Sequence, residues 1–208
     1  MTTDAAVTLH HRLAPEDRAR ADFYALLGRL YSAPPDAALL AAIGAAETMA
    51  DVTNTGLPVA WNRLVAASHA MDAEAAAQEY TDLFVGVGRS DVDLHASHWI
   101  PDVMSEKPLV ELRADLARLG LGRRPDSSTY EDNLGALFEV MRVLVEGQND
   151  RRPASIAEQR GFFDKNLASW VGDCCAAIEK NPVANYYRRV AEFTEIFVAI
   201  ERDAFAIE

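Results

Sequence analysis

Two carboxylates and two imidazoles lie close together in the middle of the chain. They are Asp91, Asp93, His95 and His98. Zinc, iron and nickel accept these ligand types, so one hypothesis is a metal-dependent enzyme built on this segment. A structural zinc site usually needs four convergent ligands, and no Cys pair or second His cluster with the spacing of zinc ligands lies elsewhere in the sequence. A polar loop that caps helices explains the same residues without a metal, and we favour that interpretation, with neither metal nor cofactor.

Large apolar residues bracket this segment and suggest binding instead of catalysis. They are Tyr80, Leu83, Phe84 and Trp99, with Gly86 as a plausible helix-terminating glycine. Aromatic residues at helical spacing usually belong to a core. Three of these four, however, lie where a helix runs into an irregular segment, and clefts are often built at such places. The sequence leaves both interpretations open.

A second candidate site is the acidic stretch Glu131, Asp132 and Asn133, which follows Tyr130. Acidic residues are common in the first turn of a helix, where they complement the helix dipole. The alternative is an acidic lip that pairs with arginine side chains of a peptide through bidentate carboxylate contacts.

Bulk properties exclude several classes of function. The chain has 208 residues, 20 Lys and Arg against 32 Asp and Glu, and a net charge of −12. Such a charge argues against general nucleic-acid binding, which requires clustered cations. No signal peptide or apolar run of membrane-spanning length is present, so we expect a cytoplasmic protein.

Catalytic motifs are also missing from the sequence. It contains neither a GxxxxGK[ST] phosphate-binding loop nor a GxSxG nucleophile motif. The two cysteines, Cys174 and Cys175, are adjacent and cannot join distant segments, which fits a reducing compartment. The residues therefore indicate a binding module and not an enzyme.

Apolar residues recur at helical spacing along almost the whole chain. This pattern predicts an all-α fold, a single bundle of about eight helices with a long central loop at 86–103 and a shorter break at 123–128. We expect residues 1–14 to be a flexible N-terminus and residues 15–208 to form one domain. The eight helices are expected near 15–33, 36–50, 61–65, 72–86, 109–120, 131–147, 155–174 and 182–200.

Several of these segments together resemble the TorD/DmsD family of redox-enzyme maturation chaperones. The family shows an E-Y-x-x-L-F-x-G core, then a loop, then a helix beginning near E-K-P-L, and later an E-P-E-D-H segment. Most of residues 20–200 follow this order, and the specific part is roughly 80–141. The matching segments here are 79–86, His98-Trp99-Ile100, Glu106-Lys107-Pro108-Leu109 and 129–133.

This resemblance implies an all-helical cytoplasmic chaperone that is not an enzyme. Its client would be the precursor of a molybdopterin oxidoreductase, recognised through its twin-arginine leader and held until the cofactor is inserted, with molybdenum-cofactor delivery proteins as further partners. The leader's hydrophobic stretch would lie in an apolar groove and its arginines would meet acidic residues. The oligomeric state would be a monomer or a helix-swapped homodimer.

The resemblance also implies which residues bind the client. The sites carried over are Tyr80, Leu83, Phe84, Gly86, His98, Trp99, Glu106, Glu131, Asp132 and Asn133. Asn133 stands where the family has histidine, so a histidine-specific contact is not expected here. Two alternatives remain: the metal-dependent enzyme, and a general helical assembly scaffold without a leader site.

Overall fold

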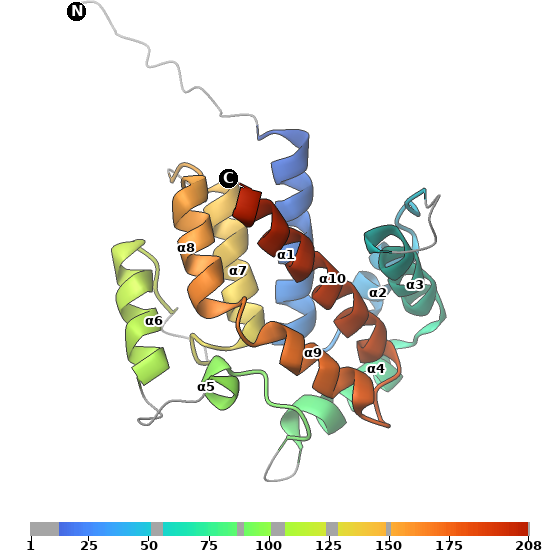
Figure 1. The fold of residues 1–208 in the computed structure, drawn as a ribbon. Helices are drawn as coiled ribbons and strands as arrows, with labels where there is room; N and C mark the ends of the chain where they lie inside the picture. Colours follow the sequence, from blue (N-terminus) through green and yellow to red (C-terminus); the bar gives the residue numbers. More distant parts are fainter. Residues whose placement is uncertain are drawn as a thin grey trace, which may run out of the picture.

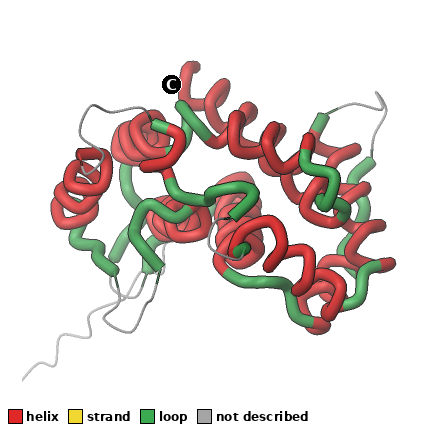
Figure 2. The backbone as a smooth tube through the Cα atoms, turned by 90° about the horizontal axis from the view of Figure 1, so that it is seen from below, coloured by secondary structure: helices red, strands yellow, loops and turns green. Residues whose placement is uncertain are grey.

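A computed structural model describes residues 13–50, 56–86, 90–100, 107–123, 129–148 and 151–207 (Figure 1). Within these residues every regular element is a helix, and the only other pairing consists of two isolated β-bridges. Figure 2 accordingly shows helix and loop alone along the described chain. The all-α prediction is confirmed. The predicted flexible N-terminus falls on residues 1–14, of which 1–12 lie outside the described part.

Ten α-helices and one π-helical turn make up the described fold, where eight helices were predicted. They are α1 Pro15–Ser32, α2 Ala37–Gly44, α3 Leu57–Ala70, α4 Ala73–Tyr80, the π turn η1 Thr81–Val85, α5 Ala96–Trp99, α6 Lys107–Arg118, α7 Leu134–Glu146, α8 Ile156–Asn166, α9 Val171–Lys180 and α10 Tyr186–Ile207.

Local capping residues begin several of these helices where the sequence predicts. Pro15 opens α1, and the side chains of Asp36 and Asp72 accept hydrogen bonds from the first turns of α2 and α4. Ser155 and Glu158 form the predicted capping box of α8.

The two additional α-helices have different origins. One arises because a predicted helix is divided in two, and the other lies in a segment predicted to be a loop. The predicted seventh helix is divided into α8 and α9 by a turn at 167–170, and the short helix α5 lies inside the predicted central loop. The α7 helix begins at Leu134, so Glu131 and Asp132 precede it and are not in its first turn. The prediction for these two acids was wrong because Asn133 provides the cap, accepting a hydrogen bond from Gly135 N at 3.0 Å.

The centre of the molecule is the contact between α1 and α7, which lie side by side in Figure 1. Two glycines make this close approach possible. A Cβ atom added at Gly135 would lie 2.8 Å from the backbone oxygen of Gly28, closer than real Cβ atoms come. Any side chain larger than hydrogen at Gly135 would push the two helices apart.

The long C-terminal helix α10 crosses this pair and packs against α9 and α3. Its aromatic side chains join the elements across the core. Phe193 lies 5.1 Å from Phe23 of α1 and 5.5 Å from Trp61 of α3, measured between ring centroids. The Phe23–Phe193 pair is edge-on and the Trp61–Phe193 pair is tilted, and aromatic contacts of this kind add to the hydrophobic gain of burial.

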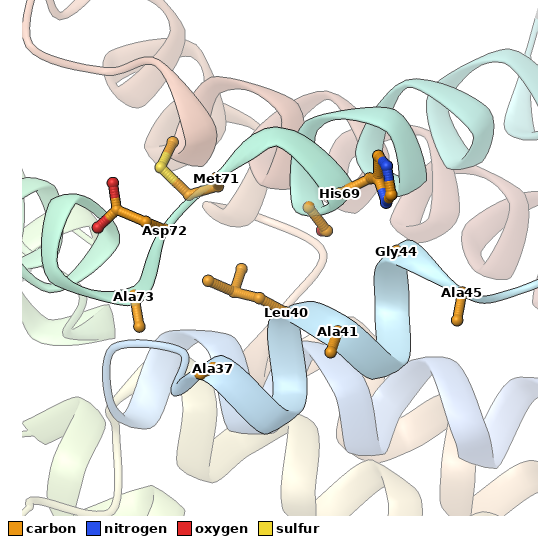
Figure 3. Close-up of a pocket in the computed structure, with 10 residues that line it drawn as sticks. Ala37, Leu40, Ala41, Gly44, Ala45, His69, Met71, Asp72 and Ala73 are labelled. Carbon is orange, nitrogen blue, oxygen red and sulfur yellow. The ribbon is translucent and has the colours of Figure 1, made fainter.

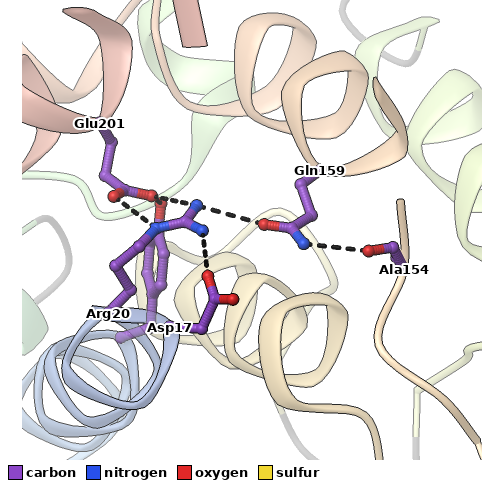
Figure 4. Close-up of polar contacts among 6 residues, drawn as sticks. Asp17, Arg20, Ala154, Gln159 and Glu201 are labelled. Atoms are coloured by element: carbon purple, nitrogen blue, oxygen red, sulfur yellow. Dashed lines mark hydrogen bonds and ion pairs between the residues drawn. The ribbon is translucent and has the colours of Figure 1, made fainter. Parts of the chain in front are cut away.

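A buried polar network joins α1 to α10 and α8 (Figure 4). Arg20 donates from Nε and Nη2 to the two carboxylate oxygens of Glu201, both at 2.8 Å. Tyr24 donates its hydroxyl to Glu201 at 2.8 Å, while Arg20 also reaches Asp17 and Gln159. Glu201 is only 2% exposed, so its charge depends on these partners.

Within the part of the chain that the structure describes, no helix is both long and apolar enough to span a membrane.

Candidate functional site

The acidic residue of the E-Y-x-x-L-F-x-G segment has a structural task. Glu79, near the end of α4, accepts backbone hydrogen bonds from Asn185 and Tyr187 at 2.8 Å and from Tyr186 at 3.0 Å. The N–H groups of Tyr186 and Tyr187 lie in the first turn of α10, and that of Asn185 directly precedes the helix, where intrahelical partners are missing. A buried carboxylate from α4 therefore caps α10 and complements its dipole.

The aromatic residues that follow Glu79 form one cluster at the end of α4. Phe84 lies 5.2 Å from Tyr80 and 4.9 Å from Tyr187 between ring centroids, and the Tyr80 hydroxyl donates to the backbone oxygen of Tyr31. Tyr80 and Phe84 are half-buried, so neither residue is fully enclosed by the core. Leu83, predicted to line a groove with them, is fully buried and supports the cluster from the core.

Gly86 ends this segment with a conformation that favours glycine. Its φ is +61°, and its N–H donates to Thr81 O at 2.8 Å, which closes the wide π turn η1. Further along the chain, Val92 N donates to Leu83 O at 2.9 Å. This bond joins the π turn to the segment that carries the histidines.

Asp93 organises that loop. The Nδ1 atom of His95 lies 2.8 Å from Asp93 Oδ1, and that of His98 lies 3.9 Å from Oδ2. The backbone oxygen of Asp93 accepts a hydrogen bond from Trp99 Nε1 at 2.8 Å. Trp99 is half-buried and His98 is exposed, and their rings meet edge to face at 5.2 Å.

The loop is attached to the start of α7 by backbone pairing. His95 and Asn133 form an isolated antiparallel bridge, and Leu134 N donates to Leu94 O at 2.8 Å. Asp132 accepts hydrogen bonds from Ala96 N at its backbone oxygen and from Ser97 N at Oδ2. Asp132 is 3% exposed, so it positions α5 and is not part of an exposed lip.

Glu131 is the predicted acid that does reach a cationic partner. Arg113 of α6 donates from Nε to Oε1 at 3.1 Å and from Nη2 to Oε2 at 3.2 Å. This hydrogen bonding holds the pKa of Glu131 below its ordinary value of 4.5, so the carboxylate is charged at neutral pH. The neighbouring Tyr130 is exposed and packs edge to face against the His95 ring.

The metal hypothesis gains no support from the geometry. Asp91 accepts a hydrogen bond from Asn181 Nδ2 at 3.1 Å, while Asp93 is engaged by the two histidines. Among the described residues, no three His, Cys, Asp or Glu side chains are arranged to hold a metal ion.

The adjacent cysteines of α9 are both buried. Cys174 contacts the backbone oxygen of Asp93 at 3.9 Å, and burial raises the pKa of its thiol to about 12. Burial also raises the pKa of Cys175 well above the ordinary value. Because the thiolate is the reactive form, these thiols are core residues and not a redox pair.

We expect both cysteines to resist alkylation in the folded protein. At pH 8, iodoacetamide should label them at least about a hundredfold more slowly than it labels a free thiol, because so little thiolate forms. Mass spectrometry measures the rate, and the same reaction in concentrated urea is the control, in which both thiols should react. Rapid labelling of the native protein would contradict the structural role.

A pocket of about 490 Å³ lies elsewhere, between α2 and the link from α3 to α4 (Figure 3). Its walls are mainly small and aliphatic side chains. Two of its polar side chains already have partners: Ser68 is bonded to Tyr186, and Asp72 caps α4. None of the predicted site residues lines it. The residues are Ala37, Leu40, Ala41, Gly44, Ala45, Ser68, His69, Met71, Asp72 and Ala73.

The structure therefore arranges the predicted residues in two groups. The aromatic cluster holds Tyr80 and Phe84 at the end of α4, while the junction of the loop with α7 holds His98, Trp99, Glu131 and Asn133. Glu106 lies outside the described residues. Sequence reasoning missed Arg113, since nothing local connects it with a residue 18 positions away.

Comparison with known proteins supplies the family. A family model described as "Nitrate reductase delta subunit" matches residues 50–176, which is more than half of the chain. The chain belongs to this family. The nitrate reductase delta subunit family is one of chaperones that mature molybdoenzymes and interact with their subunits, and its members are not catalytic. The match spans every predicted site residue, while α1 and α10 lie outside it. No curated protein matches the chain.

Proposed function

We propose that the protein binds the twin-arginine leader and the apo form of a molybdopterin oxidoreductase in the cytoplasm. It holds the precursor while the cofactor is inserted and delays export until that step is complete. Membership of the nitrate reductase delta subunit family supports the general chaperone role. The observation that carries the leader proposal is Glu131, which holds a guanidinium with both of its carboxylate oxygens.

Arginine is the cation that suits this carboxylate. Its planar guanidinium offers two parallel N–H donors, whereas the lysine ammonium is a compact point charge. The net charge of −12 also favours encounter with a basic peptide.

Apolar contacts would come from the aromatic side chains on either side of the loop. Trp99 and Phe84 are half-buried and Tyr130 is more than half exposed, so each offers ring surface to a partner. Trp99 and Ser97 both belong to the short helix α5. Ser97 N donates to the side chain of Asp132, the neighbour of Glu131, so this bond connects the element that carries the Trp99 ring with the one that carries the Glu131 carboxylate. We assign the leader's arginines to Glu131 and its hydrophobic stretch to Trp99 and Phe84.

Titration calorimetry at low salt, where electrostatic contributions are largest, tests this assignment. A peptide with paired arginines should bind the wild type, and Glu131→Gln should weaken binding about tenfold or more, because a hydrogen bond to a charged group contributes about 1.5–3 kcal/mol. A twin-lysine peptide should bind the wild type more weakly than the twin-arginine peptide does, and its affinity should fall less on Glu131→Gln.

The matched control for this experiment is Glu139→Gln. It removes the same charge from an exposed residue of α7 that pairs with Arg142 instead of Arg113. Equal affinity of the wild type for the two peptides would favour a general scaffold. Equal loss in the two variants would assign the attraction to net charge and not to Glu131.

A further inference from the structure

The carboxylate proposed to receive a client arginine is already bound by an arginine of the same chain. Arg113 approaches Glu131 edge-on, with Nε and Nη2 each facing one carboxylate oxygen. This is the two-point geometry by which a carboxylate recognises any arginine. The Glu131 side chain is 11% exposed, whereas that of Arg113 is 48% exposed. The cation is thus the more accessible member of the pair.

The helix that carries Arg113 has other attachments to the body of the protein. Lys165 of α8 lies 2.7 Å from Asp115 and 3.4 Å from Glu111, both on α6. On the same helix, Leu112 and Leu116 are buried in the core. Loss of the Arg113 contact would therefore leave α6 docked.

The pair is also weakly held in energetic terms. Arg113 is about half exposed, and exchange of one exposed guanidinium for another conserves the number of charge-assisted hydrogen bonds. Exposed ion pairs are screened by water and contribute little to stability, so water or a second arginine replaces such a partner readily. The Arg113–Glu131 pair is therefore one in which a second arginine can take the place of Arg113.

We propose that Arg113 is a built-in competitor that occupies Glu131 in the free protein and gives way to an arginine of the client. This inference rests on the proposed function, because the incoming arginine is that of the leader. Because the client's arginine must displace Arg113, the binding free energy of the client is reduced by the free energy of the Arg113–Glu131 pair. Arg113 therefore sets how tightly a precursor is held and how readily it is released.

Fluorescence anisotropy with a labelled twin-arginine peptide tests the proposal. Arg113→Gln should bind the peptide about twofold to fivefold more tightly than the control, which is the range an exposed ion pair corresponds to. The control is Arg118→Gln, which makes the same change of charge on the same helix at a residue that contacts Asp115 instead of Glu131. The gain should disappear when Glu131→Gln is present in both.

A spectroscopic measurement reports the exchange directly. In the NMR spectrum of the arginine side chains, the Nε–H signal of Arg113 should shift toward that of a solvent-exposed arginine when the peptide is added. The Arg118 signal should stay in place. Thermal unfolding of Arg113→Gln and Arg118→Gln verifies that both variants are folded.

The outcomes separate the two proposals. A peptide that binds the wild type but binds Arg113→Gln and Arg118→Gln equally would overturn the competitor and leave the proposed function standing. Weaker binding by Arg113→Gln would also overturn it, making Arg113 part of the client surface. A twin-arginine peptide that fails to bind the wild type would overturn the proposed function and this inference with it.

Discussion

Replacing Arg20 by alanine is expected to lower the free energy of unfolding by about 3–5 kcal/mol, because it leaves a buried carboxylate without its cation. Among the described residues, the Tyr24 hydroxyl would be the one hydrogen-bond donor left to Glu201. Burial of an unpaired charge is among the largest penalties that one substitution can cause. Urea unfolding followed by circular dichroism measures the change.

Two further variants identify the cause of this loss. Arg29→Ala removes an arginine of the same helix from an exposed pair with Asp36, so it should cost about 1 kcal/mol or less. The double variant Arg20→Met with Glu201→Leu removes both buried charges and should recover most of the stability. If Arg20→Ala and Arg29→Ala lose the same amount, the buried network is not what holds α1 to α10.

Replacing Glu79 by alanine is expected to have a comparable effect. Three backbone N–H groups at the start of α10, those of Asn185, Tyr186 and Tyr187, would lose their shared acceptor, at a cost of about 3 kcal/mol or more. For a chain of this size such a loss lowers the melting temperature by about 6–12 °C. Glu79→Gln should fall between the wild type and alanine, because an amide keeps one oxygen acceptor but places its NH₂ group among donors.

The control for Glu79 lies on the same short helix. Glu74 is exposed in the first turn of α4, so Glu74→Ala should change the melting temperature by only about 1–2 °C. Differential scanning calorimetry on the three variants decides the matter. Similar melting temperatures for Glu79→Ala and Glu74→Ala would show that the cap on α10 contributes little.

The helices that the sequence predicts well are those with a local start signal. Pro15, Asp36, Asp72 and Ser155 each act within three residues of their own position, so the pattern that shows them also shows the helix. The division between α8 and α9 has no such signal. The turn contains neither glycine nor proline, and it is held by the indole of Trp170, which donates to Asn166 O.

The last helix illustrates the same limit. Proline at 182 predicts a start there, yet α10 begins at Tyr186. Its acceptor is Glu79, more than a hundred residues earlier in the chain. A cap supplied by tertiary contact leaves no trace in the neighbouring sequence, so the start was misplaced by four residues.

The candidate site was predictable in its residue types and not in their partners. Glu131 and Asp132 look equivalent in the sequence, but the structure engages Asp132 with the backbone of Ser97 and leaves Glu131 for an arginine. Leu83, Tyr80 and Phe84 share a helical stripe, and only packing against Tyr187 and Tyr31 determines which of them retains exposed surface.

The bond between Arg20 and Glu201 joins residues 181 positions apart, and this separation has a consequence for biosynthesis. Ribosomes add about 5–20 residues per second, so α1 leaves the ribosome roughly 10–40 s before α10. Throughout that interval Tyr24, fully buried in the finished fold, lacks Phe197 and Glu201 of α10, which contact it there. Until the last helix emerges, the nascent chain therefore leaves uncovered a part of the core that is closed in the finished protein, although its family serves to protect other unfinished proteins.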